Sequence, residues 1–235
     1  MRAGLIFLSL LAAIATLAVI EIYAQEGVEH PFIEPKDIKP ETCLTCHPEK
    51  KDAKFVHTAV GMGCERCHRI TSADHKTAIT LVATGGDLCA TCHAPKKDPV
   101  LHGPYKAGQC LVCHDPHTGA YAAQIRADVN TLCLGCHGSG QRNVKASADQ
   151  KTVSLAGNQS VDVGDYSQAP KLALDPSGIS GHPVKGHPLT GKDPRAKNAP
   201  LNCVSCHDPH SSALPKLMPQ GVKSGQDLCA ECHRQ

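Results

Sequence analysis

The sequence has few of the residues that normally form a protein core. Its 235 residues contain no Trp, 3 Phe, 4 Tyr and 3 Met, although aromatic side chains usually dominate the buried surface of a domain. Beyond the N-terminal segment there is no second long apolar run, so no further membrane span is expected. The sequence also lacks a phosphate-binding glycine loop, a Ser-His-Asp set and a nucleic-acid motif. These absences argue against nucleotide-dependent enzymes, serine hydrolases and nucleic-acid-binding proteins.

The first 24 residues have the pattern of a secretory signal peptide. Arg2 is followed by an apolar run over residues 3–20, and Ala24 is a small residue suited to cleavage. A retained membrane anchor is the alternative, because about 18 apolar residues can also span a bilayer and Ile22 suits the cleavage site poorly. We favour cleavage and expect a periplasmic or extracellular protein, with membrane tethering through residues 1–24 as the alternative.

The 14 cysteines all fall in seven Cys-x-x-Cys-His units. Two thiols three positions apart, followed at once by a histidine, are typical of c-type haem attachment. Zinc ribbons and disulfides are the alternatives, but neither explains a histidine after every second cysteine. We therefore expect seven covalent haem c groups. The attaching residues are Cys43, Cys46, Cys64, Cys67, Cys89, Cys92, Cys110, Cys113, Cys133, Cys136, Cys203, Cys206, Cys229 and Cys232, and the proximal iron ligands are His47, His68, His93, His114, His137, His207 and His233.

The remaining histidines nearly match the number of distal ligands that seven haems need. Of 15 histidines, eight are left after the proximal set, and bis-histidine ligation requires seven. His117 lies three residues from His114, too close to reach the opposite face of the same haem, so it should bind a neighbouring iron. The predicted distal ligands are His57, His75, His102, His117, His182, His187 and His210. His30, near the start of the mature chain, is left out.

The spacing of the motifs predicts an array of haems. The first cysteines lie at positions 43, 64, 89, 110, 133, 203 and 229, a near-periodic arrangement in which neighbouring units bury one another's faces. We predict a five-haem part over 25–140, a haem-free insert over 141–200 and a two-haem part over 201–235. Within the insert, alternating residues on either side of Gly157-Asn158 permit a small β-hairpin. A flexible surface insert is an equal alternative.

The fold class follows from the ratio of chain to cofactor. Removing residues 1–24 leaves about 30 residues per haem, which is too few to enclose each cofactor in its own domain. We therefore expect a haem-cored multihaem cytochrome c. Short α-helices and irregular loops would wrap a haem chain, with little β-structure beyond the hairpin within 138–202.

Two motifs resemble a known group. Cys110-x-x-Cys-His-Asp-Pro-His117 and Cys203-x-x-Cys-His-Asp-Pro-His210, each followed by a further unit, resemble the doubled-CXXCH multihaem c-type cytochromes. The segments Phe55–Cys64 and Leu101–Cys110 also resemble that group, where a histidine lies upstream of an attachment site. The resemblance implies exported electron carriers with haems near contact distance, and some such proteins polymerise into conducting filaments.

The favoured function is electron transfer along mainly bis-histidine haems, between respiratory redox partners or to an extracellular acceptor. The formal charge of +2 omits two propionates per haem, which make the holoprotein surface more acidic. The expected partners are redox proteins and, in a conducting filament, further copies of the chain. A multihaem reductase with one open haem is the less favoured alternative, because all seven motifs end in His whereas related nitrite reductases often use Lys.

Overall fold

The computed structural model describes residues 30–138, 145–146, 152–155, 159–162, 169–174, 180–196, 198–219 and 221–233. The predicted leader, 1–24, lies outside these residues. Within the described part of the chain, no helix is long and apolar enough to cross a membrane.

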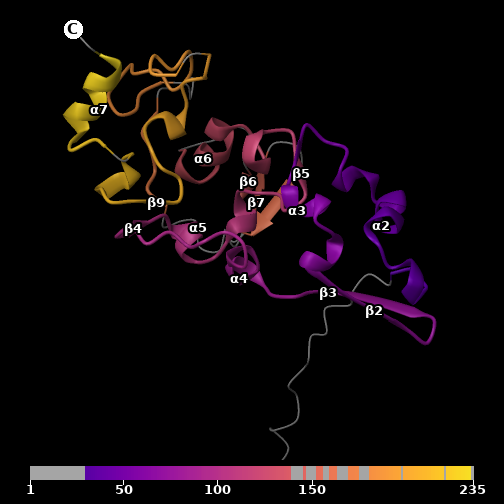
Figure 1. Cartoon of the computed structure of the whole chain (residues 1–235). Coiled ribbons are helices and arrows are strands. Elements are labelled where there is room, and N and C mark those ends of the chain that lie inside the picture. Colours follow the sequence, from indigo (N-terminus) through magenta and orange to yellow (C-terminus); the bar gives the residue numbers. More distant parts are fainter. Residues whose placement is uncertain are drawn as a thin grey trace, which may run out of the picture.

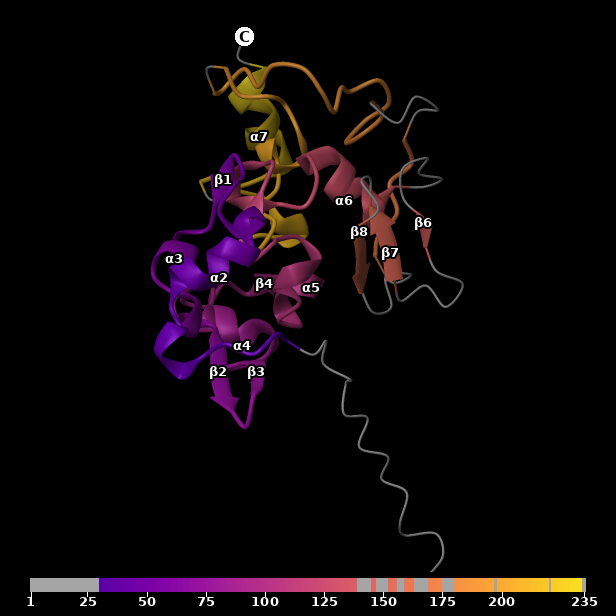
Figure 2. The same cartoon turned by 90° about the vertical axis from the view of Figure 1, so that its right-hand side faces the viewer.

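Short helices and loops make up most of the chain, as predicted. The chain runs from the end that carries α2 (Pro40–Cys46) towards α7 (Gly225–Cys232) at the far end (Figures 1 and 2). The other α-helices among the described residues are α3 (Thr58–Gly61), α4 (Gly85–Ala90), α5 (Gly103–Lys106) and α6 (Val129–His137). The 3₁₀ turns are η1 (Pro35–Asp37), η2 (Pro48–Lys50), η3 (Cys64–Arg66), η4 (Cys110–Val112), η5 (Ala122–Gln124), η7 (Cys203–Ser205) and η8 (Pro215–Leu217).

The Cys-x-x-Cys-His units occupy two kinds of turn. The first, third, fifth and seventh lie at the C-terminal ends of α2, α4, α6 and α7, whereas the second, fourth and sixth begin the turns η3, η4 and η7. Examples of both kinds have the motif histidine donating its backbone N–H to the carbonyl of the first cysteine, at 2.9 Å from His47 to Cys43 and at 3.0 Å from His114 to Cys110. Because residues three and four apart share one side of such a turn, each motif presents both thiols and its histidine together.

Four small antiparallel sheets tie the loops together. Two of them have strands of two residues and join distant segments: β1 (Phe55–Val56) pairs with β5 (Thr118–Gly119), and β4 (Val100–Leu101) with β9 (Ser211–Ser212). The other two are a hairpin of β2 (His68–Ala73) and β3 (Lys76–Leu81), and a sheet of β6 (Lys145–Ala146), β7 (Thr152–Leu155) and β8 (Gln159–Asp162).

The sequence predicted one of the two hairpins, β7–β8, and not the other, β2–β3. The predicted hairpin within 138–202 is confirmed by the pairing of β7 with β8, and the Gly157-Asn158 turn lies outside the described residues. The β2–β3 hairpin was not predicted, although residues 69–81 contain several β-branched residues. Its turn places Asp74 and His75 at φ 51° and 58°. This resembles a type I′ turn, but the usual Asn-Gly signal is missing.

The polypeptide buries very little apolar surface. Among the described residues, the buried hydrophobic side chains are Val112, Ala127, Leu134 and Leu189. A chain of this length normally forms a much larger apolar core. Packing between side chains alone therefore accounts for little of the stability of this fold.

Contacts also cross the predicted boundary between the five-motif and two-motif parts. Asn130 in α6 donates from Nδ2 to the Leu189 carbonyl at 2.7 Å, and its Oδ1 accepts from the backbone N–H of Cys203 at 3.0 Å. The division at 141–200 remains a prediction, but the two parts touch directly at this point.

Candidate functional site

Seven pairs of histidine rings face one another along the chain. Each pair joins one motif histidine to one histidine from outside the motifs, with ring centroids between 5.9 and 6.3 Å apart. The pairs are His30–His47, His57–His93, His68–His117, His102–His137, His114–His210, His182–His207 and His187–His233. All seven motif histidines are included, and none is used twice.

This spacing is the one that a six-coordinate iron requires. Two imidazoles that bind one metal from opposite sides have centroids about 6 Å apart, since each metal–nitrogen bond is about 2 Å and each nitrogen lies about 1 Å from its ring centre. Each motif supplies two thiols beside its own histidine. The donor set therefore fits haem c: the thiols would form the thioether links, and the two imidazoles would bind the iron.

Hydrogen bonds fix the tautomer of several of these histidines. Nδ1 of His30, His57, His114, His137, His187 and His207 lies 2.8 to 3.0 Å from a backbone carbonyl oxygen. A carbonyl can only accept a hydrogen bond, so each Nδ1 carries the proton and donates. Nε2 is then left with a free lone pair, and the hydrogen bond to Nδ1 holds the ring in orientation for a metal.

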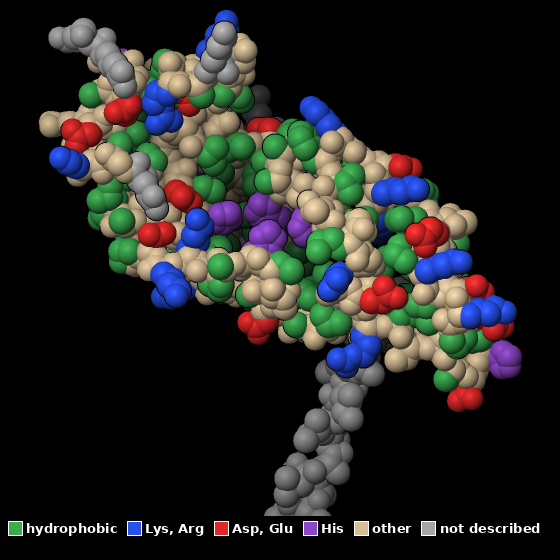
Figure 3. Space-filling view, viewed as in Figure 1, with side chains coloured by type: hydrophobic (Ala, Val, Ile, Leu, Met, Phe, Trp, Pro, Cys, Tyr) green, Lys and Arg blue, Asp and Glu red, His purple; other side chains and the backbone are tan. Residues whose placement is uncertain are grey.

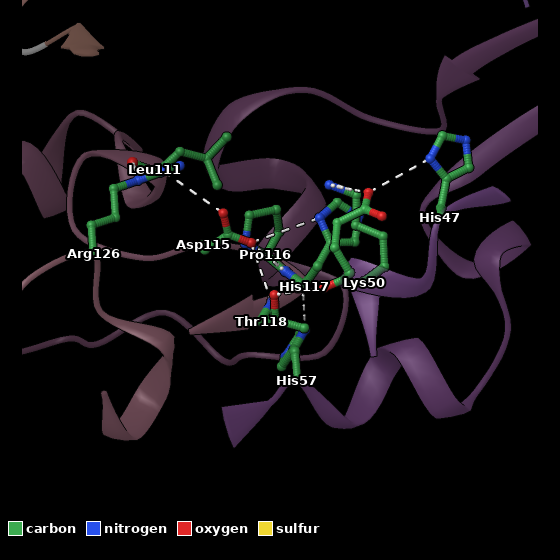
Figure 4. Close-up of polar contacts among 10 residues, drawn as sticks. His47, Lys50, His57, Leu111, Asp115, Pro116, His117, Thr118 and Arg126 are labelled. Carbon is green, nitrogen blue, oxygen red and sulfur yellow. Dashed lines mark hydrogen bonds and ion pairs between the residues drawn. The ribbon is translucent and has the colours of Figure 1, made fainter. Parts of the chain in front are cut away.

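Backbone hydrogen bonds join the segments that carry His57 and His117, and we call this contact the first of two cross-links. The backbone N–H of His57 donates to the His117 carbonyl at 2.8 Å next to the β1–β5 pair, and His57 Nδ1 donates to the Pro116 carbonyl at 3.0 Å (Figure 4). His57 faces His93, whereas His117 faces His68. One contact between backbone segments therefore positions two histidine rings, each opposite a different motif histidine.

The second cross-link repeats this arrangement further along the chain. The backbone N–H of His102 donates to the His210 carbonyl at 3.0 Å next to the β4–β9 pair. His102 faces His137, and His210 faces His114. In each cross-link the upstream histidine serves a helix-type motif, and the histidine of the Asp-Pro-His segment serves an earlier 3₁₀-type motif.

Aspartate side chains shape both Asp-Pro-His turns. Asp115 Oδ1 accepts from the backbone N–H groups of His117 and Thr118 at 2.9 and 3.2 Å, and Oδ2 lies 3.7 Å from Arg126 Nη1 (Figure 4). Burial acts to raise the pKa of Asp115, but these backbone hydrogen bonds and the Arg126 charge lower it on balance. Asp208 accepts equivalent bonds in the second cross-link. The carboxylates therefore fix where the following histidine lies.

Burial acts on many of the paired histidines and thiols. Desolvation is the main cause of the lowered pKa values of His68, His102, His117, His182 and His210, which favours the neutral form that binds metals. In the free thiols, burial raises the pKa of Cys113 to about 11.

Thiols of successive motifs lie near one another in sequence order. Burial and contact with Cys43 raise the pKa of Cys64 to about 11, and burial and contact with Cys110 raise that of Cys89 to about 11. Interaction with the Cys203 thiol also raises the pKa of Cys133. Interactions between thiols also link the second motif to the third, the fourth to the fifth and the sixth to the seventh.

The ring pairs include one histidine that the predicted set left out and leave out one that it contained. His30, left out of the predicted set, faces His47 with ring centroids 6.3 Å apart. His75, predicted as a distal ligand, sits at the exposed tip of the β2–β3 hairpin with its ring 5.3 Å from Phe32. The geometry places His30, and not His75, opposite the histidine of the first motif. His30 is the only histidine that precedes Cys43, a signal that could have identified it.

Histidine side chains gather in a hollow at the middle of one face of the molecule (Figure 3). Apolar side chains surround them there, as expected for a site that binds the faces of a porphyrin. The sequence model of the doubled CXXCH motif family matches residues 57–98, 102–142 and 194–235, which is more than half of the chain. The chain belongs to the doubled CXXCH motif family.

Each matched range of this doubled CXXCH protein contains two Cys-x-x-Cys-His units, and the unit that begins at Cys43 precedes them. The first two ranges begin at His57 and at His102, the residues that open the two cross-links. The family resemblance predicted from the sequence is thereby confirmed, and it supports covalent haem c attachment to these motifs.

A curated relative points to the same class of protein. The chain is 24% identical over 206 residues to the multiheme cytochrome MtrA of Shewanella baltica (strain OS185), and the alignment covers 82% of this chain and 52% of the relative. The chain therefore spans about half the length of that relative. The chain is accordingly a multihaem c-type cytochrome.

Proposed function

We propose that this protein is an electron carrier that holds seven haem c groups, each between the two histidines of one ring pair. The seven pairs are the observation that supports this proposal, because each has the spacing of two axial ligands and each includes one motif histidine. The proposed distal ligands are His30, His57, His102, His117, His182, His187 and His210. His75 is omitted from this set because its ring lies against Phe32.

The proposed haems follow one another in sequence order. The contacts between thiols of successive motifs support this order, since each thiol would be bonded to its haem. The contact between Cys133 and Cys203 is the important one, because 70 residues separate them in the sequence. The proposed series therefore continues from the fifth haem to the sixth across the haem-free insert, with the first and seventh haems at its two ends.

Electron transfer is favoured over catalysis by the number of paired histidines. A haem with two histidine ligands changes oxidation state without an open position for a substrate. A reductase would need at least one motif histidine without a partner ring. Each of the seven motif histidines has a partner ring. In a conducting filament, a histidine of one copy could bind a haem of the next, and His30 near the N-terminus would be the residue suited to this. His30 instead faces His47 of its own chain.

The N-terminal segment and the order of the haems bear on location and partners. Apolar residues 3–20 precede the first motif, which supports an exported protein. We propose that it works in the periplasm or outside the cell and exchanges electrons with redox proteins at the two ends of the haem series. The relative's name supports a multihaem role and does not identify these partners.

The experiment that tests this proposal is low-temperature EPR of the purified oxidised holoprotein, combined with measurement of haem and protein concentrations. We expect seven haems per chain and low-spin iron throughout, with no change on adding nitrite, hydroxylamine or cyanide. Fewer than seven haems would contradict the proposed count. A high-spin, ligand-responsive fraction in the unaltered protein would favour the reductase alternative.

A further inference from the structure

The segment that carries His30 is held in place differently from the segments that carry His57 and His102. His57 and His102 are fixed by backbone pairing with the Asp-Pro-His strands β5 and β9. The second motif, which ends at His68, is not followed by Asp-Pro-His, so the chain has no equivalent strand for His30. Instead His30 forms an isolated antiparallel bridge with Thr77 in β3. The β2–β3 hairpin therefore takes the place of the missing cross-link.

Two hydroxyl groups on this hairpin bind both backbone polar groups of Ile33. The backbone N–H of Ile33 donates to Thr77 Oγ1 at 2.8 Å, and Ser72 Oγ donates to the Ile33 carbonyl at 2.5 Å. Ser72 and Thr77 are direct partners in the β2–β3 register, and their hydroxyl oxygens lie 3.0 Å apart.

Counting protons fixes the direction of the third hydrogen bond. Ser72 has one hydroxyl proton, and its contact with the Ile33 carbonyl is much shorter than the 3.4 Å to the Lys76 carbonyl. The proton of Thr77 must therefore point to Ser72 Oγ. The result is a closed ring in which Ile33 N–H donates to Thr77, Thr77 donates to Ser72, and Ser72 donates to the Ile33 carbonyl.

Apolar packing contributes little to holding this segment. Phe32 is 39% exposed, and a cavity of about 570 Å³ lies between the segment and the hairpin, lined by His30, Phe32 and His75 among others. Thr77, in contrast, is only 7% exposed. Hydrogen bonds that are shielded from water can therefore hold the segment in one position, which loose apolar packing cannot do.

We propose that Ser72 and Thr77 are positioning residues that hold His30 against the iron of the haem attached at Cys43 and Cys46. This inference rests on the proposed pairing of His30 with His47. Both hydroxyls act through Ile33, three residues from His30. Loss of the ring would free His30 to leave its position and expose one coordination site.

The test compares Thr77→Val, Thr77→Ser and Thr80→Val in the oxidised holoprotein. Thr77→Val removes two hydrogen bonds of the ring. Their loss should shift the equilibrium between attached and detached His30 towards the detached form by roughly thirtyfold. We expect the apparent affinity of one haem for cyanide to rise by about that factor, with a new high-spin EPR signal of at most about one-seventh of the iron. Added imidazole should remove this signal. Thr77→Ser keeps the hydroxyl and should behave as the unaltered protein. Thr80→Val alters an exposed residue of the same strand and is the matched control.

His30→Ala separates failure of this inference from failure of the proposed function. If His30→Ala opens one haem to cyanide and Thr77→Val behaves like Thr80→Val, the hydroxyl ring does not position His30 and the inference is overturned. If His30→Ala opens no haem, His30 is not a ligand, and the proposed pairing is wrong for the first motif. Haem content and circular dichroism of each variant show whether it has folded.

Discussion

The haem proposed between His187 and His233 should have an electronic signature that distinguishes it from the others. The planes of these two rings are 72° apart, whereas the angles in the other six pairs range from 5° to 38°. Parallel imidazoles interact with the same iron d orbital and separate it in energy from its partner. Nearly perpendicular imidazoles interact with both orbitals alike and leave them close in energy, because each ring acts on a different one.

Two nearly degenerate orbitals give a low-spin ferric iron a strongly anisotropic g tensor. We therefore expect the EPR spectrum of the oxidised protein to contain one highly anisotropic low-spin signal, from about one-seventh of the iron, beside the rhombic signals of the nearly parallel pairs. His187→Ala should remove that signal and introduce a high-spin signal of equal intensity.

The matched control is His117→Ala, which removes a ring from the pair with the smallest interplanar angle, 5°. It should leave the anisotropic signal unchanged while it reduces the rhombic signals. The reasoning is refuted if the anisotropic signal is missing from the unaltered protein, or if it survives His187→Ala and disappears in His117→Ala.

Three further predictions address ligation, folding and pH. Replacing His75 by Ala should leave every haem low-spin, whereas replacing His57 by Ala should open one; an open haem in the His75 variant by EPR would restore His75 as a ligand. Protein prepared without haem should show no cooperative thermal transition by circular dichroism, because so few side chains are buried; a sharp transition would show that the polypeptide folds alone. Hydrogen bonds from Ser205 and Arg195, together with the Arg195 charge, lower the pKa of Asp193. Asp193→Asn should therefore cost about 1 kcal/mol of holoprotein stability at neutral pH. Since the folded pKa lies below the ordinary Asp value of about 3.9, the difference in melting temperature between variant and parent should shrink as the pH falls below that value; a constant difference down to pH of about 2 would contradict the assignment.

The sequence by itself determined the chemistry of the molecule. A Cys-x-x-Cys-His unit can be recognised without a fold, because its five residues bring two thiols and an imidazole to one side of a single turn. The number of haems proposed, and a supply of spare histidines large enough to pair with them, could therefore be predicted. The hairpin around Gly157-Asn158 was also accessible, since its alternation and its turn residues are both local.

Only the tertiary structure decided which histidine faces which motif. His117 lies three residues from His114 but faces His68, and His210 faces His114 from 96 positions away. These placements depend on two-residue strand pairs between distant segments, which leave no periodic pattern in the sequence. Proximity along the chain was for this reason a poor guide to which motif each histidine faces.

His30 and His75 show the same limit most clearly. His75 is close to a motif in sequence, yet its left-handed backbone conformation in a tight turn carries it to the tip of a hairpin. His30 is farther from its motif, but hydroxyl groups from that same hairpin bind the segment that holds it. Short motifs determine the local chemistry, whereas the position of His30 depends on hydrogen bonds between residues about 40 positions apart, which form only when the chain folds.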